Sequence, residues 1–117
     1  KIGENDDEIN IALTESNPLN NLNKYFPQLF RLGQNYPNPF NPNTIIRFDI
    51  SNTTKVLLRL YDVNGKHINT LINNELFQSG FYEYLLKSED LDLSSGIYIY
   101  KIETESWNSS KKMLLLK

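Results

Sequence analysis

The sequence contains no cysteine and only one histidine, His67. The absence of cysteine excludes disulfide bonds and thiolate metal sites, although it does not fix the cellular compartment. Nucleophilic catalysis needs a base with an orienting partner, and a lone histidine without a convergent pair of acids does not supply one. We therefore predict that the chain is not an enzyme and needs no cofactor.

Strong charge of one sign and long apolar runs are also missing. Twelve basic and 14 acidic residues give a net charge of −2, so no basic face for nucleic acid is expected. No apolar run approaches the ~20 residues of a membrane span, and no signal peptide is recognisable. Because the chain begins at Lys1 rather than at methionine, we expect a processed or excised chain.

One acidic segment is the best candidate for a metal site. Glu89, Asp90 and Asp92 lie in the segment 89–96 at a spacing similar to the start of a calcium loop. The twelfth position, where such a loop needs a bidentate acid, is Lys101. A solvated acidic loop is therefore favoured, and no metal site is predicted.

The sequence is organised around a proline-rich stretch, Gln34–Thr44. Each proline fixes φ and lacks an N–H, and each residue before a proline is pushed to extended geometry. We expect a stiff strap across the edge of a folded domain, which holds the preceding tail away from that domain. Pro39–Pro42 also matches the PxxP pattern of polyproline ligands, but such matches are frequent by chance and the strap is favoured.

Residues 1–33 are expected to form a tail or linker. Ile9, Ile11 and Leu13 alternate with Asn10 and Ala12, which is the period of a half-buried strand. Two interpretations stay open for this stripe: a docking strand that pairs with a neighbouring copy, or a flexible spacer.

Beyond the prolines, short alternating runs separated by turns predict strands. Asn64-Gly65 is the strongest hairpin signal, because both residues tolerate positive φ, and Trp107 is expected at a hairpin tip, packed down on the neighbouring strand. Strands are expected at 44–50, 55–62, 66–72, 81–86, 97–102 and 111–117, with Asn73-Asn74 as the break after 66–72 and a further strand around 76–77. In the last run Met113 and Leu115 lie on one face and Leu114 and Leu116 on the other, which favours a strand inside the sandwich with apolar side chains buried on both faces. The pattern predicts an all-β, immunoglobulin-like antiparallel sandwich of about seven strands over residues 34–117.

Four motifs follow one another in this part of the chain. They are Asn35-Tyr36-Pro37-Asn38-Pro39-Phe40-Asn41-Pro42, then Tyr61–Gly65, then Ser95-Gly96-Ile97-Tyr98, and the ending Lys111-Lys112-Met113-Leu114-Leu115-Leu116-Lys117. In this order they resemble the C-terminal sorting domain of type IX (Por) secretion cargo, over roughly residues 32–117. The pattern is similar also to the immunoglobulin-like domain of flagellar hook-capping proteins.

The resemblance implies a route out of the cell. Outer-membrane secretion and attachment machinery would be the partners, the final location would be extracellular or on the cell surface, and Lys111–Lys117 would belong to the transport signal. Such domains normally follow a large cargo, whereas only a 33-residue tail precedes this one. Two hypotheses therefore compete: a sorting and anchoring module, or a structural subunit that forms an extracellular filament through its tail.

Overall fold

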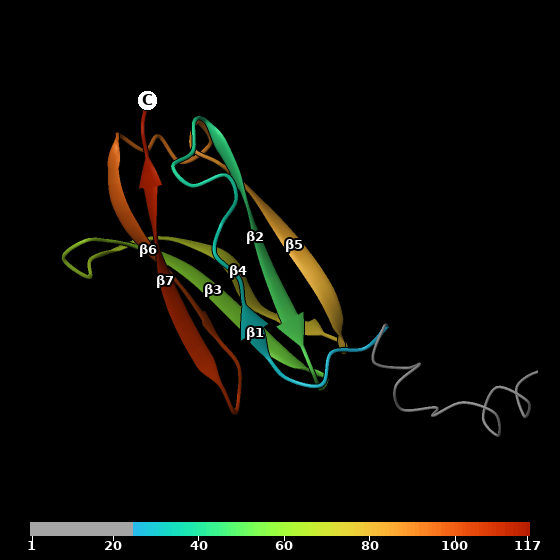
Figure 1. The fold of residues 1–117 in the computed structure, drawn as a ribbon. Helices are drawn as coiled ribbons and strands as arrows, with labels where there is room; N and C mark the ends of the chain where they lie inside the picture. Colours follow the sequence, from blue (N-terminus) through green and yellow to red (C-terminus); the bar gives the residue numbers. More distant parts are fainter. Residues whose placement is uncertain (1–24) are drawn as a thin grey trace, which may run out of the picture.

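The computed structural model of the chain describes residues 25–117, so the candidate strand Ile9–Leu13 lies outside the described residues. Within residues 25–117, seven strands form two antiparallel sheets that pack face to face as a β-sandwich (Figure 1). The prediction of an all-β sandwich of about seven strands is confirmed.

The two sheets differ in width. The smaller sheet has three strands in the order β1-β2-β5, and the larger sheet has four in the order β4-β3-β6-β7. The strand bounds of the smaller sheet are β1 (Arg31–Leu32), β2 (Asn43–Ile50) and β5 (Gly80–Lys87). Those of the larger sheet are β3 (Thr54–Asp62), β4 (His67–Phe77), β6 (Gly96–Glu103) and β7 (Asn108–Leu115).

The core lies between the sheets and is built from alternate residues of each strand, because successive side chains of a strand point to opposite faces. The expected inward faces are confirmed. Fully or almost fully buried side chains on three central strands are Ile46, Phe48, Ile50, Val56, Leu58, Leu60, Tyr98, Tyr100 and Ile102.

Two expected strand boundaries are wrong. Asn73-Asn74 was expected to end a strand, but β4 continues through it to Phe77. Two residues of β4 oppose one residue of β3 there, and Asn74 has a φ of 53°, which is the geometry of a bulge rather than of a turn. The seventh strand is therefore not at 76–77. It is β1, which lies in the segment assigned to the tail and places Leu32 in the core.

The last strand was expected inside the sandwich with apolar side chains buried on both of its faces, and this is also wrong. β7 is an edge strand of the larger sheet. Met113 and Leu115 are buried, whereas Leu114 is half-buried and Leu116 is 52% exposed. In a two-layer sandwich each sheet has only one face toward the core, so the other face of β7 meets water.

Trp107 lies in the turn between β6 and β7 and is half-buried. Its ring stacks on Phe30 with a centroid separation of 5.3 Å. Trp107 therefore packs down on the sandwich, as expected, but its partner precedes β1 in the chain.

Candidate recognition site at the C-terminal strand

The segment Gln34–Pro42, called the proline strap below, fastens β7 to the rest of the molecule. Phe40 forms a parallel bridge with Leu115: the Phe40 N–H donates to the Leu114 carbonyl at 2.9 Å, and the Leu116 N–H donates to the Phe40 carbonyl at 3.1 Å. The proline strap thus leaves the smaller sheet at β1 and joins the edge of the larger sheet. This confirms the prediction of a strap across the sandwich edge.

Side chains of the proline strap complete this attachment. Gln34 Nε2 donates to the Lys112 carbonyl at 2.7 Å, and the Leu114 N–H donates to Asn38 Oδ1 at 3.0 Å. Prolines have no N–H, so amide side chains supply hydrogen bonds that a regular strand would make with its backbone. The edge of β7 between Lys112 and Leu116 is therefore occupied and does not offer its backbone to another strand.

A buried polar network holds the start of the proline strap. The Tyr100 hydroxyl donates to the Gly33 carbonyl at 2.7 Å and accepts from the Asn35 N–H at 2.8 Å. Asn35 Nδ2 donates to Thr44 Oγ1 at 3.0 Å, and the Thr44 hydroxyl donates to the Pro37 carbonyl at 2.8 Å. Burial raises the pKa of Tyr100 to about 12, so this hydroxyl keeps its proton at physiological pH. The motif residue Asn35 therefore has a structural role.

The two glycines of the expected motif set, Gly65 and Gly96, also have structural roles. Gly65 has a φ of 87° in the turn after β3, which a residue with a side chain adopts only with strain. The Asp62 carboxylate accepts from the N–H groups of Asn64 and Lys66, both at 2.9 Å, and shapes this turn. Gly96 opens β6 with a φ of 156°. Both glycines therefore have a structural role, in the conformation of the backbone.

The predicted transport signal divides into a buried and an exposed set. Met113 and Leu115 belong to the core, and their side chains are almost inaccessible to water. The exposed or half-exposed members are Lys111, Lys112, Leu114, Leu116 and Lys117. Lys117 is also held through its N–H, which donates to Ser95 Oγ at 2.9 Å.

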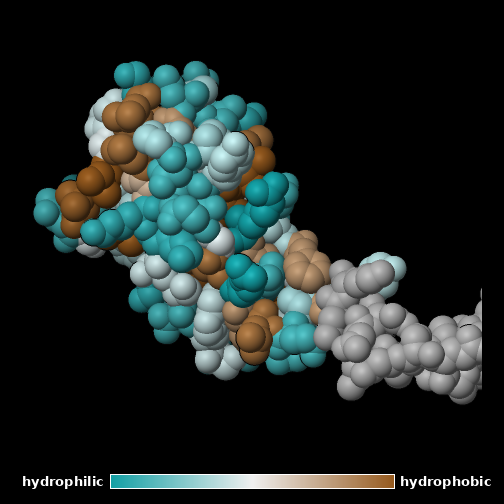
Figure 2. Space-filling view, viewed as in Figure 1, coloured by the Kyte–Doolittle hydropathy of each residue, from teal (hydrophilic) through white to brown (hydrophobic). Residues whose placement is uncertain are grey.

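The outer side chains of β7 border an apolar surface. Leu114 lies opposite Ile97 of β6, which is 47% exposed. A shallow groove there is lined by Asn38, Ile97, Lys112, Met113 and Leu114. Figure 2 shows apolar atoms gathered over the upper parts of β6 and β7. The site thus combines exposed aliphatic side chains with flanking lysines, which suits a protein partner rather than a small molecule.

Sequence reasoning placed Gln34 and Thr44 at the ends of the proline-rich stretch without giving either a role, and it did not single out the Tyr100 hydroxyl. All three supply hydrogen bonds around a segment in which prolines remove backbone donors. Polar side chains that flank a proline-rich run are the signal that would have directed attention to Gln34 and Thr44.

The other candidates from the sequence, His67 and the acidic loop, do not belong to this site. His67 is exposed, with Nε2 2.9 Å from Thr70 Oγ1 and its ring edge-on to Tyr61. Across residues 25–117, no three His, Cys, Asp or Glu side chains form a group that could hold a metal ion, the acidic loop at Glu89–Asp92 included. In the same range, no helix has the length and apolar character needed to cross a bilayer.

The fold and this site define an all-β sandwich module with its C-terminal strand fastened at the surface. A family model described as a secretion system C-terminal sorting domain matches residues 34–116. The chain belongs to this family of type IX sorting domains, as its motifs predicted. The match contains the whole proline strap and all of β7. No curated protein matches the chain, and the further resemblance to flagellar hook-capping proteins is not supported.

Proposed function

We propose that this chain is a non-enzymatic sorting module, and that outer-membrane secretion machinery recognises it through the outer face of β7. Membership of the sorting-domain family supports export and contact with that machinery. The observation that carries the choice of surface is the division of the C-terminal signal. Met113 and Leu115 anchor the strand, while Lys112, Leu114 and Leu116 remain available to a partner.

The chemistry of this face suits recognition of a folded domain. Burying an exposed leucine or isoleucine against a partner contributes about 1.5–3 kcal/mol, and Leu114, Leu116 and Ile97 together offer a small apolar anchor. The Lys112 and Lys117 side chains would steer an acidic partner surface and set its orientation. After export, the module would lie outside the cell or on the cell surface, where attachment machinery would act on it.

One observation favours the second hypothesis, a structural subunit that assembles with copies of itself. Within the described part of the chain, β5 has a partner strand on one side only. A subunit of a filament needs such an edge to receive a strand from its neighbour.

The sorting function is tested with a reporter that carries a signal peptide for the inner membrane and residues 1–117 at its C-terminus. In a bacterium with a type IX secretion system, we expect the reporter in the medium or on the surface. In an otherwise identical strain without the outer-membrane translocon, it should stay in the periplasm.

Removing Lys111–Lys117 from the same fusion is expected to leave the reporter in the periplasm of the secreting strain, because both the anchor and the exposed face are lost. Cell fractionation with an antibody against the reporter gives the distribution. Secretion at the normal level after this deletion would contradict the proposed function.

A further inference from the structure

In the part of the chain that the structure describes, the unequal width of the sheets leaves one side of the core only half-buried. β1 lies beside β7 on one side of the sandwich, and on the other side the smaller sheet ends at β5 while the larger sheet continues to β4. Five apolar or aromatic side chains on this side pack against the core but are only half-buried. They are Ile68, Leu71, Phe77, Tyr82 and Tyr84.

The outer edge of β5 is the regular free edge of the described sandwich. The edge of β7 is occupied by the proline strap, β1 has only two residues, and β4 is interrupted by register shifts. By contrast, all eight residues of β5 pair with β2 without interruption, and β5 contains no proline. Native edge strands are usually covered, bulged or very short, whereas among residues 25–117 β5 is eight residues long, pairs regularly with β2 and has no strand on its other side.

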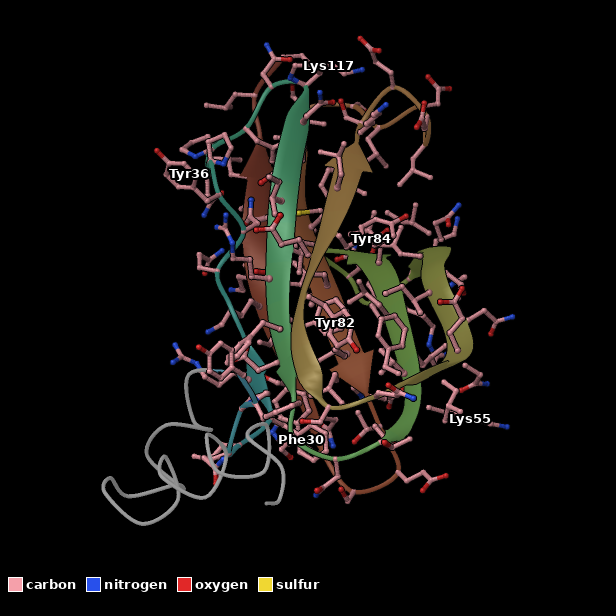
Figure 3. All side chains as sticks on the ribbon, turned by 90° about the vertical axis from the view of Figure 1, so that its right-hand side faces the viewer. Phe30, Tyr36, Lys55, Tyr82, Tyr84 and Lys117 are labelled. Atoms are coloured by element: carbon pink, nitrogen blue, oxygen red, sulfur yellow. The ribbon has the colours of Figure 1, made fainter. Side chains whose placement is uncertain are left out.

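The side chains next to this edge specify what kind of strand would fit. Tyr82 and Tyr84 point from β5 into the space between β5 and the β3–β4 side of the sandwich (Figure 3). A strand added beside β5 would place every second side chain in line with these tyrosines, over the half-buried residues of β4. The fitting occupant is therefore a strand with one apolar face and a period of two.

We propose that residues 8–14 of the same chain occupy this edge as a fourth strand of the smaller sheet. Ile9, Ile11 and Leu13 supply an apolar face at the required period. The first described residues also lie close to the end of β5 that residues 8–14 would have to reach. Pro27 and Leu29 line a shallow groove there with Phe81, at the start of β5. Figure 1 shows this first described segment beside that end of β5.

The tether length permits this docking. Residues 15–24 span up to ~33 Å at about 3.3 Å per residue, whereas an eight-residue strand such as β5 measures ~27 Å. With residue 14 near Gly80, the segment would run antiparallel to β5. A tether this short gives a millimolar effective concentration, so the chain's own segment outcompetes that of a neighbour. The proline strap follows β1 in the chain and lies against its own sandwich, so it does not hold Tyr25 away.

The test compares hydrogen exchange in the 117-residue chain with exchange in Ile9→Asp/Ile11→Asp. We expect the β5 amides that point away from β2 to be protected in the wild-type protein and to exchange at least tenfold faster in this variant. Amides of β3 and β6 should be unchanged, which shows that the sandwich stays folded. Asn10→Asp/Ala12→Asp adds the same charge on the opposite face and should keep the protection.

Sedimentation over a hundredfold range of concentration distinguishes the occupants. A monomer with protected β5 amides supports the proposal. Protection that appears only together with oligomers would overturn it and assign the edge to a second copy of the chain. Equally fast exchange of these amides in the wild-type protein and in Ile9→Asp/Ile11→Asp would overturn it in favour of a spacer. None of these outcomes depends on export, so the sorting function is tested separately.

Discussion

Replacing Phe40 with alanine is expected to lower the free energy of unfolding by about 3–5 kcal/mol, the usual cost of removing a buried aromatic ring. The Phe40 side chain is 2% exposed and carries the proline strap into the core. Its backbone makes two of the hydrogen bonds that join the strap to the C-terminal strand, the ones with Leu114 and Leu116. Loss of the ring therefore weakens both the core and the attachment of the C-terminal strand.

Urea denaturation of the 117-residue chain measures this effect. Tyr36→Ala is the matched control, because Tyr36 belongs to the same strap but is 72% exposed and points outward (Figure 3). The control should change the unfolding free energy by no more than about 0.5 kcal/mol. A cost for Phe40→Ala as small as that of the control would show that the strap is not anchored through this ring.

Tyr100→Phe is expected to cost about 2–6 kcal/mol of stability near neutral pH, because it leaves two buried polar groups unsatisfied. The hydroxyl satisfies the Gly33 carbonyl and the Asn35 N–H in a buried site, and an unsatisfied buried polar group costs about 1–3 kcal/mol. The ring itself is retained, so no large cavity contributes. Urea denaturation at pH 7 gives the value, with Tyr61→Phe, a half-buried tyrosine on the outer face of β3, as the control.

The same hydroxyl predicts a stability change at high pH. Burial raises the Tyr100 pKa from 10.0 to about 12, so the folded state holds this proton more tightly than the unfolded state. Its contribution is complete below pH 10 and is lost as the pH rises from about 10 to 12. The stability difference between wild type and Tyr100→Phe should therefore narrow across this window. A difference that stays constant from pH 9 to pH 12 would contradict the assigned burial of the proton.

Much of the fold was predictable because alternation of apolar residues reports which face of a strand is buried. The inward rows of β2, β3 and β6 followed directly from this rule. Alternation does not report where a strand lies in its sheet, and for this reason β7 was misplaced as an interior strand. β1 is too short for any period to be visible.

The error at Asn73-Asn74 has a local cause. Asparagine tolerates positive φ, so the pair Asn73-Asn74 predicts a turn. In the structure, the same tolerance allows a bulge at Asn74. The attachment of the C-terminal strand to the proline strap was not predictable for a different reason. Its hydrogen bonds with Gln34 and Asn38 join residues that are 78 and 76 positions apart, and such pairings depend on the folded topology.

The central claim is that the secretion machinery recognises the outer face of β7 during export. The double variant Leu114→Asp/Leu116→Asp in the reporter fusion tests this claim most directly. Asn108→Asp/Ser110→Asp adds the same charge to exposed positions at the opposite end of β7, away from Ile97 and Leu114, and serves as the control. The account predicts that the first variant stays in the periplasm and the control is secreted, while both unfold within about 1 kcal/mol of the wild-type chain. Normal secretion of folded Leu114→Asp/Leu116→Asp would contradict it.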